Sequence, residues 1–149
     1  MVFNNPDARE LTVGSLGTIQ WPAGWTYYVG RAHYGWSSRL KRFTDEEQSL
    51  HWHVDYLVNQ TSVEITHLLP FQESGERECE LADWFQNRDS MRRLAADFGS
   101  SDCSSSCGGH GFVSERSPRS LFEKLQSSNF AFSGYVQFES HRCRWNPSS

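Results

Sequence analysis

The sequence predicts a small α/β or α+β domain built on a mixed or antiparallel sheet. Segments with strand-like and helix-like patterns interleave along the chain, short turns join the early strands, and no segment repeats. A chain of 149 residues with 37% hydrophobic residues can bury one core and fits a single domain. The composition therefore argues against a disordered chain.

The amino-terminal part is predicted to consist mainly of strands. Residues 10–13 and 17–21 are typical of two short strands joined by a glycine-bounded turn. A Pro-Ala-Gly turn leads into residues 25–30, whose aromatic and β-branched side chains favour a third strand. Residues 62–69 are predicted to form another strand.

Helical periodicity and turn residues account for most of the remaining chain. Helices are predicted over residues 39–43 after a serine cap, over 50–57, from Glu76 onward, over 89–96 and over 118–126. Residues 98–111 are predicted to be a loop, because Gly and Ser dominate them. A final strand is expected at residues 130–138.

The segment Leu50 to Leu57 gathers two imidazoles, a carboxylate, a phenol and an indole. In a helix, His51 would lie beside Asp55, because residues four apart share a face. Two interpretations stay open. The helix forms one wall of a functional site, or it is a buried element in which His51 and Asp55 simply pair.

Net charge and hydropathy limit which partners and which cellular location the sequence favours. The formal net charge is -4, which is no global signature of a nucleic-acid-binding protein, although a local basic patch can still bind DNA. No apolar run reaches the roughly 18 residues of a membrane span, and the first residues carry no signal region. We therefore expect no membrane partner and a cytoplasmic location.

The four cysteines are expected to be thiols or metal ligands rather than disulfides, because no secretion signal accompanies them. Cys103, Cys107 and His110 are spaced by three and two intervening residues. Zinc prefers four Cys or His ligands in a tetrahedral array, and Cys79, Cys143 or His141 could complete such a set. The spacing matches no standard zinc finger, so free thiols are the alternative.

Five motifs, taken together and in order, resemble one branch of the GIY-YIG nuclease superfamily. The motifs are Tyr27 to Ala32, Ser38 to Arg42, His51 to Leu57, Glu78 to Ala82, and Phe98 to Cys103. The branch consists of small domains that occur alone or fused to a DNA-repair glycosylase. The resemblance implies a GIY-YIG-like domain over residues 1–112, with a three-stranded sheet flanked by helices. Residues 113–149 would be an extension that packs on the domain or completes it.

The resemblance also implies roles for individual residues. Tyr28 would lie in the active site, Arg39 would contact the scissile phosphate, and Glu78 would hold Mg²⁺ or Mn²⁺. These residue types suit phosphodiester hydrolysis, which needs a clamp on the phosphate, a Lewis acid and a base for water. The base is open: Tyr28 could orient the water or accept its proton, and His51 or His53 is a substitute base. The predicted contacts to DNA are made by Arg31, Lys41, Arg42 and His53.

Three departures from the family concern catalysis more than fold. No Gly-x-Tyr signature precedes Gly14, Phe43 stands where a histidine is usual, and the carboxyl-terminal cysteine motif is stretched. The first strand of the sheet is therefore expected to be missing. Either upstream residues have been lost, which we favour, or the strand at residues 130–138 takes the vacant place.

The predicted function is a magnesium-dependent endonuclease that hydrolyses phosphodiester bonds in DNA, with DNA repair as its setting. A second hypothesis is a non-catalytic module that keeps the fold and binds nucleic acid or another partner. A third is a regulatory domain stapled by zinc.

Overall fold

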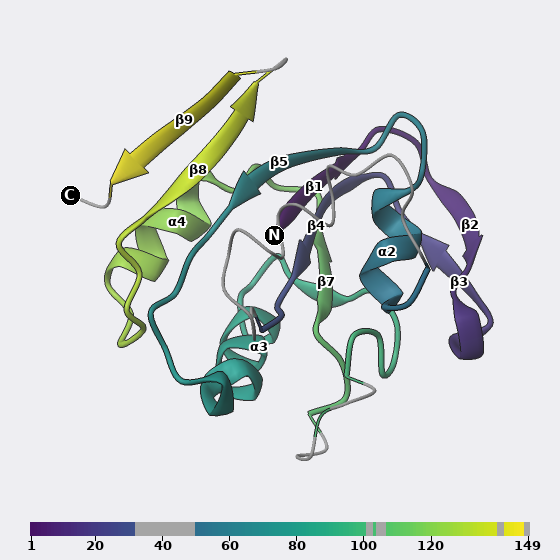
Figure 1. Ribbon diagram of the computed structural model, residues 1–149, viewed down its shortest axis with the longest axis horizontal. Helices are drawn as coiled ribbons and strands as arrows, with labels where there is room; N and C mark the ends of the chain where they lie inside the picture. Colours follow the sequence, from purple (N-terminus) through teal and green to yellow (C-terminus); the bar gives the residue numbers. More distant parts are fainter. Residues whose placement is uncertain (32–49, 101–102, 104–106, 140–141, 148–149) are drawn as a thin grey trace.

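A computed structural model describes residues 1–31, 50–100, 103, 107–139 and 142–147. Within these residues the fold is mixed α+β, with seven strands in one antiparallel sheet (Figure 1). In spatial order the strands are β6 (Arg92–Arg93), β7 (Gly111–Ser114), β4 (Gly24–Tyr28), β1 (Val2–Asn5), β5 (Glu64–Leu68), β8 (Gly134–Glu139) and β9 (Arg142–Pro147).

A separate hairpin pairs β2 (Arg9–Thr12) with β3 (Thr18–Trp21) around the short 3-10 turn η1 (Gly14–Leu16). The hairpin confirms the first two strands predicted from the sequence. Trp21 is buried, and its indole N–H donates to the Thr26 hydroxyl on β4 at 2.8 Å. The hairpin is thereby fixed to the main sheet.

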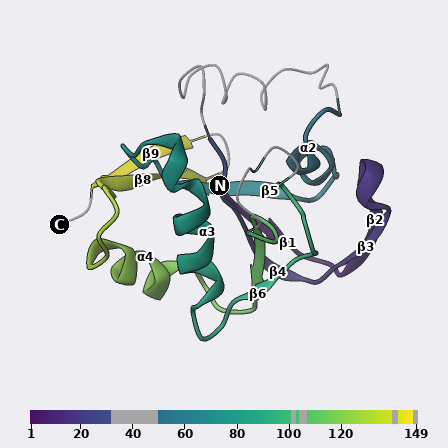
Figure 2. The same cartoon turned by 90° about the horizontal axis from the view of Figure 1, so that it is seen from below.

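Three helices are described: α2 (His53–Val58), α3 (Glu78–Gln86), which follows the 3-10 turn η2 (Gly75–Arg77), and α4 (Arg119–Gln126). One, α2, lies on one face of the sheet, and the other two, α3 and α4, lie on the opposite face (Figure 2). None of the described helices is long and apolar enough to cross a membrane.

Side-chain alternation along the central strands builds a core on each face. Val2, Tyr27 and Phe112 belong to one cluster, together with buried residues of α3 and α4. Their sequence neighbours Phe3, Tyr28 and Val113 belong to the other cluster, together with residues of α2. The three central strands are therefore buried on both faces.

Strand β1 corrects the expectation of a missing first strand and of a three-stranded sheet. Residues Val2–Asn5 pair with β4 on one side and with β5 on the other. The place that was predicted to be vacant is held by β1, and the tail strand β8 pairs with β5 instead.

Other elements differ from the sequence prediction in extent or type. The predicted helix at residues 89–96 is wrong, since turns and the two-residue strand β6 occupy that segment. The predicted helix 50–57 begins only at His53, whereas α3, α4, β4, β5 and β8 lie close to their predicted places. The predicted helix 39–43 lies outside the described residues.

The expected boundary between residues 112 and 113 falls within β7. Leu121, Phe122 and Leu125 of α4 also share a core cluster with Val2 and Tyr27. Residues on the two sides of the boundary therefore contribute to the same sheet and the same core.

Candidate functional site

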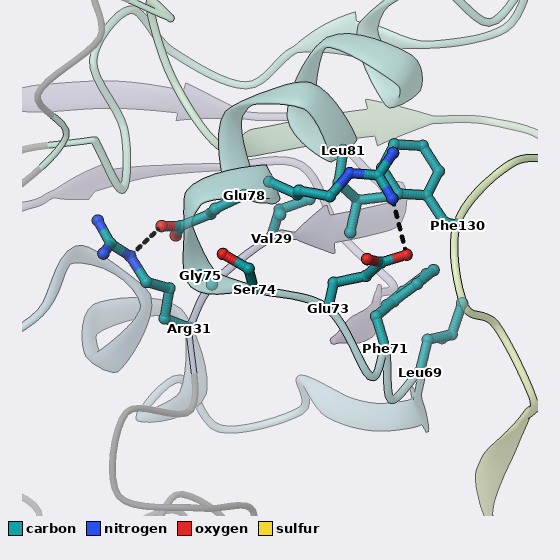
Figure 3. Close-up of a pocket in the computed structure, with 12 residues that line it drawn as sticks. Val29, Arg31, Leu69, Phe71, Glu73, Ser74, Gly75, Glu78, Leu81 and Phe130 are labelled. Carbon is teal, nitrogen blue, oxygen red and sulfur yellow. Dashed lines mark hydrogen bonds and ion pairs between the residues drawn. The ribbon is translucent and has the colours of Figure 1, made fainter.

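A pocket of about 350 Å³ lies between the end of β4 and the start of α3 (Figure 3). Its apolar lining includes Leu69, Phe71, Leu81 and Phe130. Its charged lining residues are Arg31, Glu73, Arg77 and Glu78. A polar group of a ligand can therefore meet both signs of charge beside an apolar surface.

Glu78 and Arg31 form an ion pair at one side of this pocket. Arg31 Nε donates to Glu78 Oε2 at 2.6 Å, and the Glu78 side chain is only 10% exposed. Burial by itself would raise the pKa of Glu78. The contacts with His110 and Arg31 outweigh burial and hold that pKa below its usual value. Glu78 is thus an ionised, largely buried carboxylate at the pocket.

A second ion pair lines the pocket further along the same segment. Arg77 Nη1 donates to Glu73 Oε1 at 2.9 Å, and the Arg77 guanidinium lies 4.6 Å from the centre of the Phe130 ring. Sequence reasoning missed this pair, although Glu73 and Arg77 are spaced four residues apart, which is a usable signal.

The Tyr28 ring lies between two glycines. A Cβ atom added to Gly30 would lie 2.7 Å from Tyr28 Cε1, and one added to Gly99 would lie 2.7 Å from Tyr28 Cε2. Gly99 also has a φ of +74°, a backbone conformation that favours glycine. Tyr28 lines a smaller cavity of about 50 Å³, which shares Val29 and Gly30 with the main pocket.

Cys79, Cys103, Cys107 and His110 form a compact cluster, which we name the Cys3His cluster. One ligand atom from each residue lies within 4.8 Å of all the others. The three sulfur atoms are 2.8 to 3.1 Å apart, well beyond the roughly 2.05 Å of a disulfide bond. Burial, followed by the contacts with the other two thiols, raises the pKa of the Cys107 thiol. Such a group of residues could hold a metal ion.

His110 connects the Cys3His cluster to the pocket carboxylate. Its Nε2 lies 2.9 Å from Cys107 Sγ, and its Nδ1 lies 3.2 Å from Glu78 Oε1. The latter contact is close enough for an ion pair, but its geometry is not that of a well-formed hydrogen bond. Burial would lower the pKa of His110, but contact with the Glu78 carboxylate outweighs it and raises that pKa.

The two histidines of the segment 50–57 are not among the residues that line the main pocket. His53 Nδ1 accepts a hydrogen bond from the Gly99 N–H at 2.8 Å, so this histidine supports the loop that packs on Tyr28. His51 is exposed, and its ring meets that of Trp52 edge to face.

The expected helical pairing of the His51 and Asp55 side chains is wrong, because α2 begins after His51. The Asp55 carboxylate instead accepts hydrogen bonds from the backbone N–H groups of His51 and Trp52, at 2.9 and 2.6 Å. Asp55 therefore caps α2.

The structure brings several predicted site residues together. Arg31 and Glu78 line the main pocket, and Tyr28 lines the smaller cavity that shares Val29 and Gly30 with it. Among the described side chains, Cys79 lies with Cys103, Cys107 and His110. Arg39, Lys41, Arg42 and His141 lie outside the described residues, and Cys143 is described only as part of the backbone of β9.

The comparisons with known proteins identify a family of undefined function. The family model described as "Domain of unknown function DUF123" matches residues 1–130. No curated protein and no solved structure matches the chain. Because the family match covers most of the 149 residues, the chain belongs to the DUF123 family.

Proposed function

We propose that this protein is a divalent-metal-dependent endonuclease that hydrolyses phosphodiester bonds in DNA at the pocket beside Glu78. The observation that carries the proposal is the ion pair of Glu78 and Arg31 at the main pocket, next to a smaller cavity that is lined by Tyr28 and shares Val29 and Gly30 with that pocket. Glu78, Arg31 and Tyr28 come from α3, from the segment after β4 and from β4 itself. The same residues stand in the motifs that resemble GIY-YIG nucleases, and this resemblance supports the proposal.

Each of the three side chains has a distinct task. Glu78 is an ionised carboxylate, the ligand type that Mg²⁺ or Mn²⁺ prefers, and when bound the ion supplies Lewis acidity at the phosphate. Arg31 can place its terminal guanidinium nitrogens on a phosphate oxygen. Tyr28, held between Gly30 and Gly99, orients the attacking water through its hydroxyl.

The remaining predicted roles concern DNA contact and the base. Arg39, Lys41 and Arg42 are proposed to bind the DNA backbone, which gives affinity without choice of sequence. His51 stays the candidate base, with His53 as its alternative. DNA repair is the proposed setting, on the resemblance alone.

We propose that the protein binds two different metals, one at Glu78 and one at the Cys3His cluster. Magnesium takes oxygen ligands and keeps much of its hydration, so it suits Glu78 and not the thiols. Sulfur and imidazole ligands select zinc, so zinc is the metal proposed for the Cys3His cluster.

Cleavage of labelled duplex and branched DNA tests this function. With Mg²⁺ or Mn²⁺, the wild-type chain should nick or cut at least one substrate, and EDTA should stop the reaction. Glu78→Gln should lower the rate by at least about 100-fold, because a carboxylate that carries a catalytic ion is removed. Glu80→Gln is the matched control, since Glu80 lies on the same helix with its side chain 62% exposed.

Two outcomes would contradict the proposal. Cleavage by Glu78→Gln at the wild-type rate would remove Glu78 from the reaction. Salt-dependent DNA binding with no cleavage in any divalent metal would instead favour the non-catalytic binding module.

A further inference from the structure

The Cys3His cluster joins α3 to the loop that precedes β7. Cys79 is the second residue of α3, whereas Cys103, Cys107 and His110 belong to the Gly- and Ser-rich segment that ends at β7. Backbone hydrogen bonds hold the base of this segment, from Asp97 to Gly108 and from His110 to Phe98. The cluster lies where the loop meets the helix.

We infer that Cys79, Cys103, Cys107 and His110 bind one zinc ion, and that Glu78 is the outer carboxylate that orients His110. This zinc site goes beyond the proposed hydrolysis, and zinc binding is measured without DNA. Four protein ligands complete a tetrahedral shell, which is typical of a structural zinc site rather than a catalytic one.

The donor set fits zinc in number, type and spacing. Zinc–sulfur bonds of about 2.3 Å in a tetrahedron place sulfurs about 3.8 Å apart. The three sulfurs are 2.8 to 3.1 Å apart, so binding of zinc would move each pair of sulfurs apart by about 0.7 to 1 Å. The thiols give up their protons to solvent when they bind the metal.

The surrounding charges also fit a zinc–thiolate group. Three thiolates and one neutral imidazole leave a bound Zn²⁺ with one net negative charge. Arg93 Nη2 donates to the Cys107 carbonyl at 3.3 Å, so one guanidinium lies beside this group. Arg31 lies on the other side, paired with Glu78.

The orientation of His110 assigns the role of Glu78. Its Nε2 faces the sulfurs, so binding of a metal there leaves the imidazole proton on Nδ1. That atom is fully buried and has no well-formed hydrogen bond, and its near neighbour is Glu78 Oε1 at 3.2 Å. A histidine ligand commonly donates its second N–H to a carboxylate, which fixes the ring and raises its basicity.

The same carboxylate therefore faces two ways. Oε1 lies toward His110 and the cluster, and Oε2 accepts from Arg31 at the pocket. Zinc bound at the cluster would fix His110, and His110 would in turn fix the Glu78 carboxylate through Oε1. It would also fix the loop at Gly99, against which the Tyr28 ring packs.

Metal analysis of the purified chain, without added chelator, tests the site directly. One zinc per chain is expected, and Co²⁺ exchange should give the visible bands of tetrahedral cobalt together with thiolate charge-transfer bands. Absence of zinc from the folded protein, combined with no such bands on Co²⁺ titration, would overturn the inference.

Cysteine variants identify the ligands. Cys79→Ser should lose the zinc or bind it far more weakly, and Cys143→Ser is the matched control that should keep one zinc per chain. If Cys79→Ser fails to fold, Co²⁺ spectra of the wild type still report the number of thiolate ligands, for which three are expected. Zinc retained by Cys79→Ser and lost by Cys143→Ser would overturn the ligand set.

Zinc affinity, measured by competition with a chromophoric chelator, tests the outer carboxylate. Glu78→Gln should keep the 1:1 stoichiometry and bind zinc about 10- to 100-fold more weakly. Glu80→Gln should bind as the wild type does, and equal affinity in both variants would overturn the role of Glu78. A zinc-loaded chain that never cuts DNA would defeat the proposed nuclease alone, whereas a zinc-free chain that cuts DNA would defeat the zinc site alone.

Discussion

At the scale of single residues, the site depends on two places where only glycine fits. The Tyr28 ring occupies the space that a Cβ atom of Gly30 or Gly99 would need. The Tyr28 ring therefore fits only because neither position carries a side chain. Any residue larger than glycine at position 30 or 99 would place its Cβ atom against the ring.

Gly99→Ala tests this packing. The substitution should lower the free energy of unfolding by about 1 to 3 kcal/mol, because it adds a clash with Tyr28 to backbone strain at a positive φ. Gly17→Ala separates the two effects, since Gly17 has a φ of +78° but no atom within 4 Å of the added Cβ. Urea unfolding of both variants gives the comparison, and an equal loss in the two would contradict the packing of Tyr28 against Gly99.

At the scale of elements, α2 is a six-residue helix whose start is fixed by one carboxylate. A helix this short gains little from its own hydrogen bonds, so its cap and its buried face keep it in place. Val54 and Leu57 provide that face, in the same cluster as Phe3 and Tyr28.

Asp55→Ala should therefore destabilise the protein by about 1 to 2 kcal/mol, because the backbone N–H groups of His51 and Trp52 lose their acceptor. Asp83→Ala removes an exposed carboxylate from α3 and should change stability by less than about 0.5 kcal/mol. Chemical denaturation measures both, and a loss in Asp55→Ala no greater than in Asp83→Ala would remove Asp55 from the capping role.

Elements with local signals were predictable from the sequence, and those that depend on distant partners were not. The hairpin of β2 and β3 has its turn and both strands within 13 residues, and its pattern is clear. Strand β1 is four residues long and ends in two asparagines, which are disfavoured in strands. Its pairing with β4 and β5 determines its strand conformation. The segment 89–96 carries helix-forming residues, yet pairing of Arg92 and Arg93 with β7 determines its structure.

The site follows the same rule. Cys103, Cys107 and His110 are close in sequence and were recognised as a possible ligand set. Cys79 precedes Cys103 by 24 residues and was one of three candidates to complete the set, and only the fold could show that Cys79 lies beside Cys103. The contact between His110 and Glu78 joins two predicted residues that no spacing connects.

At the scale of the whole molecule, β5 and β8 join the amino-terminal part of the sheet to its carboxyl-terminal part, and His67 is buried at that junction. Its ring meets those of Phe122 and Tyr135 edge to face at 5.1 and 5.5 Å. Burial, followed by the positive charge of the amino terminus, lowers the pKa of His67 to about 4. The folded protein therefore keeps this histidine neutral at pH values where the unfolded chain binds a proton.

The free energy of unfolding should consequently decrease as the pH is lowered from 6.5 to 4. In that window the unfolded state carries the extra proton, and the loss from His67 alone reaches roughly 3 kcal/mol. Below the folded pKa the contribution of His67 stops changing. His67→Gln removes the titrating group, so the free energy of unfolding of this variant should depend less steeply on pH. Parallel slopes for the wild type and His67→Gln across this window would contradict the assignment.

We propose that Glu78 holds a hard divalent ion at the pocket beside Arg31. Mn²⁺ binding to the zinc-loaded protein, followed by electron paramagnetic resonance of the free ion, measures it without DNA. We expect one Mn²⁺ site in the wild type and in Glu80→Gln, and at least about 10-fold weaker Mn²⁺ binding in Glu78→Gln. Equal Mn²⁺ binding by all three proteins, or none by the wild type, would contradict it.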